Sequence, residues 1–160
     1  MKHAKLLGLG LLAIALVITG CNLTTTPPKG KDGDSAKKDD HKPHGKGPNG
    51  GVVEDLGKYH FEFTVDHDAK SCKIIILGND EKTPVKIACT EITVITKEAK
   101  TTKDGKKVDA MTIKLEPKDA ADGKASIFVG TDPGLGNVAD FEGSVQATID
   151  GKPSNGKFKE

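Results

Sequence analysis

The chain has 160 residues, a formal net charge of +1 at pH 7, and neither arginine nor tryptophan. Without arginine it lacks the planar guanidinium groups that grip phosphates and base edges, so nucleic acid is excluded as an expected partner. One tyrosine and five phenylalanines leave few rings for a sugar-binding platform, which disfavours carbohydrate recognition.

The amino terminus has the pattern of an export signal. Lys2 and Lys5 precede an apolar run that begins at Leu6 and closes at Ile18-Thr19-Gly20-Cys21. The run is too short for a lasting membrane helix, and small residues at its end are typical of a peptidase site. An ordinary cleaved signal followed by an incidental cysteine would show the same pattern.

The residues at the end of this run resemble the lipobox of bacterial lipoproteins, in which an aliphatic residue, a small residue and glycine precede a cysteine. The resemblance implies acylation of Cys21 and a lipid anchor in a membrane outside the cytoplasm. It divides the chain into a signal peptide (1–20), a lipidated cysteine with its tether (21–47) and a domain (48–160). Asn22, where inner-membrane lipoproteins often have Asp, favours the outer membrane in a cell that has one.

The tether has few large apolar residues and is rich in Lys, Asp, Gly and Pro. Such a segment buries too little surface to offset the entropy lost on ordering, so we expect it to be flexible. A flexible chain of about 25 residues would hold the domain on the order of 25–30 Å from its anchor.

From Gly50 onward, short β-rich runs alternate with Gly, Pro, Asn and Asp. Three runs are apolar on one face and polar on the other: 59–65, 111–116 and 144–149. Further strands are expected at 52–54, 72–77, 85–87, 90–97, 125–129 and 156–159. The pattern predicts an all-β domain, either an Ig-like β-sandwich or a partly open barrel of about seven to nine short strands. Asp150-Gly151 is expected to form a hairpin turn.

Cys72 and Cys89 are the two cysteines of the predicted domain. A hairpin pairing 74–77 with 85–88 would place them directly opposite each other, at the Cβ separation that a disulfide needs. An oxidising exterior permits this pairing. The alternative is two buried thiols that pack as small hydrophobic groups.

The four histidines after the signal lie within twenty-seven residues: His41, His44, His60 and His67. His60 and Glu62 stand two apart on a predicted strand and project from the same face. His44 precedes a glycine-rich run that could fold it back against that strand. His44, His60 and Glu62 are therefore candidate ligands for copper, zinc, nickel or cobalt. Otherwise they are ordinary surface residues, and His67, between two aspartates, indicates a turn.

A second resemblance covers about a third of the chain. It includes His44-Gly45, Gly50-Gly51-Val52-Val53-Glu54, the run 56–62 and Lys82-Thr83-Pro84-Val85. This stretch resembles small extracytoplasmic β-domain lipoproteins and, more distantly, the amino-terminal region of heavy-metal efflux adaptors. The resemblance implies metal handling or envelope assembly. The hairpin and coiled-coil portions of an adaptor are missing, so the chain is not itself an adaptor.

No catalytic pattern stands out. The glycine-rich run 130–136 lacks the Gly-Lys-Ser/Thr of a phosphate loop, and nothing indicates a Ser-His-Asp triad. We therefore expect a membrane-anchored binding protein rather than an enzyme, with transition-metal handling as its specific chemistry. The alternative is a structural or interaction module without a metal site, whose partner is another protein of the cell envelope.

Overall fold

The computed structural model describes residues 44–160, which form an all-β domain with one turn of 3-10 helix and no α-helix in that range. The export signal, Cys21 and His41 lie outside the described residues. None of the helical segments in 44–160 has the length and apolar character needed to cross a membrane. The elements are β1 Val52–Leu56, β2 Tyr59–Asp66, β3 Ser71–Leu77, β4 Ile92–Thr96, β5 Ala99–Lys100, β6 Lys107–Val108, β7 Thr112–Pro117, β8 Ile127–Thr131, η1 Pro133–Gly136, β9 Glu142–Ile149 and β10 Lys152–Lys159.

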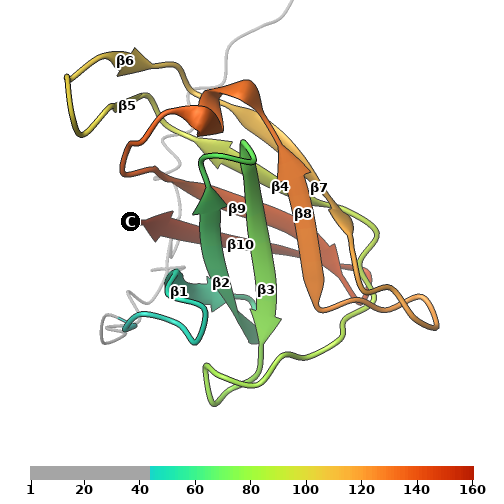
Figure 1. The fold of residues 1–160 in the computed structure, drawn as a ribbon. Helices are drawn as coiled ribbons and strands as arrows, with labels where there is room; N and C mark the ends of the chain where they lie inside the picture. The colour runs from blue at the N-terminus through green and yellow to red at the C-terminus, as the bar shows by residue number, and fades with distance from the viewer. Residues whose placement is uncertain (1–43) are drawn as a thin grey trace, which may run out of the picture. The chain divides into compact units, whose positions relative to one another are not determined.

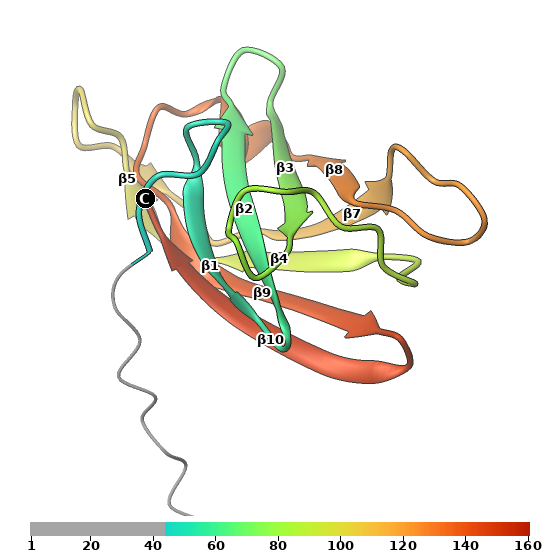
Figure 2. The same cartoon turned by 90° about the horizontal axis from the view of Figure 1, so that it is seen from below.

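Eight strands form one antiparallel sheet in the order β1-β2-β3-β8-β7-β4-β9-β10, and β5 pairs with β6 separately. The sheet coils until the β9–β10 ribbon runs behind β2 and β3 (Figure 1). Viewed from below, β10 curves back toward β1 (Figure 2). The two end strands pack together, so the domain is a nearly closed barrel. Of the two predicted architectures, the barrel is confirmed.

The barrel closes by packing between β1 and β10. A Cβ atom at Gly156 would lie 2.4 Å from the carbonyl oxygen of Asp55, which only a glycine can accommodate. At one end of this seam the hydroxyl of Tyr59 donates to Asp150 Oδ2 at 3.3 Å, and Lys58 Nζ lies 3.2 Å from the same oxygen. These contacts join the β1–β2 turn to the β9–β10 turn.

Strand alternation fills the inside of the barrel with apolar side chains. Phe61 and Phe63 of β2 are fully buried, as are Phe128 and Phe141. The rings of Phe63 and Phe158 pack with centroids 4.2 Å apart. At about 25 cal/mol per Å² of buried apolar surface, these aromatic residues contribute strongly to the stability of the domain.

The structure confirms the alternating strands that the sequence predicted. The runs 59–65, 111–116 and 144–149 correspond to β2, β7 and β9. Asp150 and Gly151 both have positive φ angles, 52° and 75°, in the two-residue turn between β9 and β10. This conformation gives the turn the twist that an antiparallel hairpin requires.

The predicted hairpin after β3 is wrong beyond its first residues. Leu77 pairs with Pro84, and the amide of Val85 donates to the carbonyl of Ile76 at 2.9 Å, both in the predicted register, but the pairing ends there. Ile87 instead pairs with Ala125, and β8 takes the place beside β3. A strand far along the chain has therefore replaced the local partner.

This exchange separates the two cysteines. Cys72 lies opposite Val65 on one side and Gly130 on the other, rather than opposite Cys89. Both cysteines are free thiols buried in the same hydrophobic core. Their burial raises the pKa of Cys72 to about 12 and also raises the pKa of Cys89.

We expect both thiols to resist alkylation in the folded protein, because the reactive thiolate is scarce when the thiol pKa is raised and the sulfur is buried. Iodoacetamide treatment at pH 8 followed by intact mass measurement should add no label to Cys72 or Cys89 before denaturation and one label to each afterwards. The assignment of free thiols would be contradicted if the two cysteines resisted alkylation in denaturant without reductant but reacted once reductant was added.

Candidate metal centre

Residues 44–51 form a strap that folds back against β1 and β2. Lys46 pairs with Val52, and the amide of Gly47 donates to the carbonyl of Gly51 at 2.9 Å. The amide of Gly50 donates to the carbonyl of Gly47 at 3.0 Å, and its φ of 84° favours glycine. The glycine-rich run therefore makes a tight turn, which brings His44 back to the outside of the barrel. Part of this strap precedes residue 48, the predicted start of the domain.

Glu62 holds the strap in place. Its side chain is fully buried on β2, and its carboxylate accepts the Asn49 amide at 2.8 Å, the Asn49 side-chain Nδ2 at 2.8 Å and the Gly51 amide at 3.0 Å. A Cβ on Gly47 would lie 2.4 Å from Glu62 Cδ, so the strap backbone approaches this carboxylate closely. Buried hydrogen bonds to a charged group are stronger than neutral ones, and these three fix the strap.

Beside the strap, His44, Asp55 and His60 bring one ligand atom each to within 4.8 Å of one another. The antiparallel register places Asp55 of β1 directly opposite His60 of β2. His60 Nε2 lies 3.2 Å from Asp55 Oδ1, and His44 Nε2 lies 3.7 Å from Asp55 Oδ2. The two imidazole rings meet edge to face, with centroids 5.1 Å apart.

The outer nitrogen of each ring has its own partner. His60 Nδ1 lies 3.1 Å from the carbonyl oxygen of Gly78. Because a carbonyl can only accept, this nitrogen carries the proton and Nε2 keeps its lone pair when the ring is neutral. His44 Nδ1 lies 3.0 Å from Glu81 Oε1. This contact likewise favours a proton on Nδ1 and a lone pair on Nε2 of His44. Histidine ligands of metals are commonly oriented by a carbonyl or carboxylate in this way.

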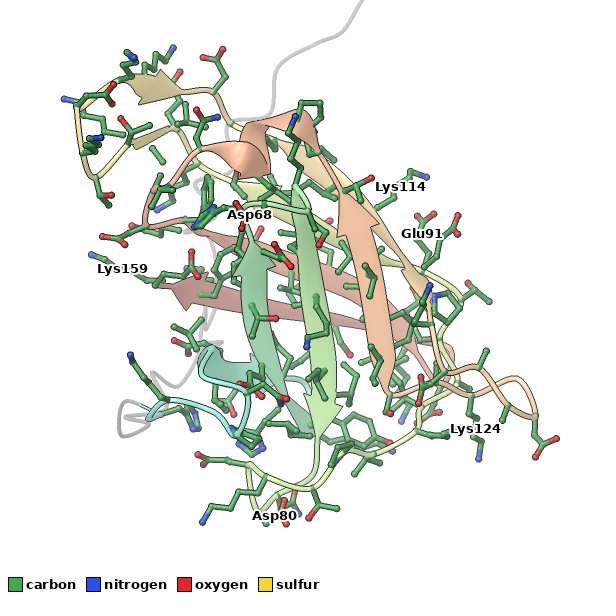
Figure 3. The ribbon with its side chains drawn as sticks, viewed as in Figure 1. Asp68, Asp80, Glu91, Lys114, Lys124 and Lys159 are labelled. Carbon is green, nitrogen blue, oxygen red and sulfur yellow. The ribbon has the colours of Figure 1, made fainter. Side chains whose placement is uncertain are left out.

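Glu81 reaches the group from the loop that follows β3. Asp80, which Figure 3 shows at the end of the molecule where β3 finishes, accepts the amides of Lys82 and Thr83 and the Thr83 hydroxyl. These bonds lower the pKa of Asp80 to about 2, so it stays ionised and keeps the loop turned. Glu81 itself has a φ of 58°, within the left-handed region. The loop therefore holds the Glu81 carboxylate beside the imidazoles.

The group has a buried side and an open side. The side chains of His44 and His60 are 10% and 16% exposed, whereas those of Asp55 and Glu81 are 42% and 39% exposed. Within residues 44–160, His44 Nε2 is a buried nitrogen that makes no hydrogen bond. An unsatisfied buried polar atom is costly, and a bound cation would satisfy this one.

These donors suit a transition metal. In a tetrahedral site with bonds of about 2.0–2.1 Å, ligand atoms are separated by roughly 3.3–3.4 Å. His60 Nε2 lies 3.2 Å from Asp55 Oδ1 and His44 Nε2 lies 3.7 Å from Asp55 Oδ2, so each nitrogen is at about that distance from one of the two carboxylate oxygens. Two imidazoles and one carboxylate do not suit calcium or magnesium, which take all-oxygen sites.

The structure brings together two of the three predicted ligands. His44 and His60 belong to the group, but Glu62 does not, because all its hydrogen bonds go to the strap. Asp55 joins the histidines in its place. The sequence carried a signal for it: the short Gly57-Lys58 turn sets the register that puts Asp55 opposite His60.

His67 lies apart from this group, in the turn after β2, as the sequence predicted. Its Nδ1 lies 2.8 Å from the carbonyl oxygen of Leu135 in η1. This contact links the β2–β3 turn to the segment between β8 and β9, so His67 has a structural role.

The chain matches no protein-family model, and neither the curated proteins nor the solved structures contain a significant match to it. The fold and the His44–Asp55–His60 group therefore carry the functional argument.

Replacing Glu62 with alanine should destabilise the domain without any metal present, because the buried donors of Asn49 and Gly51 would lose their acceptor. We expect the free energy of unfolding in urea to fall by about 1–3 kcal/mol. The matched control is Glu142→Ala, which removes an exposed carboxylate paired with Lys97 and should change the stability little, because an exposed ion pair is screened by solvent. Equal stability of the two variants would contradict the anchoring role of Glu62.

Proposed function

We propose that this protein is a lipid-anchored, extracytoplasmic transition-metal-binding protein. Its domain binds one metal ion through His44 Nε2, His60 Nε2 and the carboxylate of Asp55. The observation that carries the proposal is the convergence of these three side chains, with the outer nitrogen of each imidazole held by a separate acceptor. Each imidazole can therefore donate the lone pair of its Nε2 to the same metal ion.

The strap makes this site dependent on the folded domain. His44 comes from the strap, Asp55 from β1 and His60 from β2, while Glu81 supports His44 from the loop after β3. Asp55 and His60 face each other across one hairpin, but His44 joins them only when the strap folds back. Metal binding therefore draws on the folded barrel and should stabilise it, because the unfolded chain cannot present the same set of ligands.

The donors favour copper, zinc, nickel or cobalt. Imidazole nitrogen is a good ligand for each of these ions, and zinc is commonly held by histidine together with a carboxylate. The positive charge of the ion would also relieve repulsion between Asp55 and its neighbour Glu54, whose pKa is raised by burial and, to a lesser extent, by Asp55.

Calorimetric titration of the full-length protein in detergent with Cu²⁺, Zn²⁺, Ni²⁺ and Co²⁺ tests the proposal. We expect one ion per chain at neutral pH. His60→Ala should weaken binding by at least about a hundredfold, because loss of even an outer-sphere partner costs 10–100-fold. The matched control is His67→Ala, which removes a histidine outside the group and should leave the affinity unchanged.

Two results would overturn the metal site. One is that no metal ion binds in a saturable way with an affinity above that of ordinary exposed carboxylates. The other is equal affinity in the His60→Ala and His67→Ala proteins. Either would favour the alternative of an interaction module of the cell envelope that binds no metal.

The lipid anchor rests on the sequence alone, since Cys21 lies outside the described residues. In a bacterial host, the intact mass of the purified protein should show loss of the first twenty residues and addition of acyl chains at Cys21. More than one acyl chain on Cys21 would anchor the protein stably, so it should sediment with membranes. Cys21→Ser should lose the acyl mass and the membrane association, whereas Cys72→Ser should retain both. Membrane association that survives Cys21→Ser would contradict lipidation at this residue.

A further inference from the structure

We infer that the tight turn Gly78–Glu81, which contains no proposed ligand, controls the metal affinity by orienting both imidazoles of the site. The turn follows β3, and it reaches the outer nitrogen of His60 through a backbone carbonyl and that of His44 through a side chain. The inference rests on the proposed function, since it needs a metal bound through the Nε2 atoms of both histidines. It adds Glu81 as a positioning residue outside the ligand set.

One carbonyl joins the turn to His60. The carbonyl oxygen of Gly78 accepts the amide of Glu81 at 3.0 Å, which closes the turn, and His60 Nδ1 lies 3.1 Å from the same oxygen. A carbonyl oxygen has two lone pairs and can accept both protons. Closure of the turn and placement of the proton on His60 Nδ1 therefore depend on one atom.

The side chain of Glu81 has the corresponding role for His44. Its Oε1 lies 3.0 Å from His44 Nδ1 and 3.9 Å from His60 Nε2, so it is closest to the nitrogen that faces away from the proposed metal. Within residues 44–160, Nε2 of His44 makes no hydrogen bond. Because the partner of one ring nitrogen decides which nitrogen carries the proton, the Glu81 carboxylate selects the form of His44 that has a lone pair on Nε2.

The backbone of Glu81 is a second, independent observation. Its φ of 58° lies in the left-handed region, where glycine is favoured and a residue with a Cβ is strained. Asp80 fixes this backbone by accepting the amides of Lys82 and Thr83. Strained residues of this kind cluster at functional sites, where the surrounding structure holds them. The turn by itself would favour glycine at position 81, whereas the contact with His44 requires the side chain.

The test compares Glu81→Gly with the matched control Asp122→Gly. Both replace an acidic residue at a left-handed φ, 58° and 52°, with the residue that this backbone favours. Asp122 lies in the loop before β8 that also contains Lys124, which Figure 3 shows well apart from Asp80. We expect neither variant to lower the urea midpoint of the metal-free protein much, because relief of the left-handed backbone offsets a lost, partly exposed contact.

Calorimetric titration of the full-length proteins in detergent with Zn²⁺ measures the affinity. Glu81→Gly should weaken binding about 10–100-fold, which is the usual effect of removing an outer partner of a histidine ligand. Asp122→Gly should leave the affinity unchanged. Glu81→Gln should recover part of the loss, because its amide oxygen can still accept the proton of His44 Nδ1.

NMR of the imidazole nitrogens in the metal-free protein gives a readout that a merely structural role would not change. The spectra are taken above the ordinary imidazole pKa, where the rings are neutral. In Glu81→Gly, His44 should lose its preference for a proton on Nδ1, while His60 keeps its own through the Gly78 carbonyl. Asp80→Ala, which releases the whole turn, should change both rings.

Several results would overturn the role of the turn and leave the proposed function standing. These are equal affinities of Glu81→Gly and Asp122→Gly, and a His44 ring that keeps its proton on Nδ1 in Glu81→Gly. A loss in Glu81→Gln as large as that in Glu81→Gly would mean that the carboxylate binds the metal itself. A large fall in the urea midpoint of Glu81→Gly would mean that Glu81 serves the fold. Absence of metal binding by the unmodified protein would overturn the proposed function and the inference with it.

Discussion

The candidate site depends on one buried carboxylate. Glu62 lies on β2 with no exposure to solvent, yet it contacts no cation among residues 44–160; its partners are Asn49 and the amide of Gly51. The strap covers this carboxylate and also supplies its hydrogen-bond donors, so its closure leaves no unpaired group in the interior. The same closure carries His44 to β1 and β2. An interaction that stabilises the fold thus also completes the proposed ligand set.

The rest of the centre is built by ordinary features of β-structure. The short turn after β1 sets the register of Asp55 and His60, and the loop after β3 brings Glu81 to the outer nitrogen of His44. Each of these segments is held by bonds that involve no ligand atom, such as the three hydrogen bonds to Asp80. The ligands are therefore oriented before any metal arrives, which lowers the entropic cost of binding.

Local patterns predicted the fold well where one face of a strand is buried. The alternation in 59–65 and 144–149 placed Phe61, Phe63 and Val145 in the core, because a strand buries every second side chain. The hairpin that would have paired Cys72 with Cys89 ends after Leu77–Pro84 and Ile76–Val85, so the prediction was wrong from there on. The distant strand β8 occupies that edge, and pairing between segments so far apart leaves no trace in the residues near Cys89.

The site shows the same division. The sequence alone determined that histidines gather near a glycine-rich turn and that His60 and Glu62 share a face of one strand, and its first residues carry the pattern from which a lipoprotein export signal is predicted. Only the tertiary structure decided that Glu62 turns its carboxylate to the strap and that Asp55 takes the position beside the histidines. The physical reason is burial. Residue spacing specifies the face on which a carboxylate lies, but whether it binds a cation or backbone amides depends on which segment covers it.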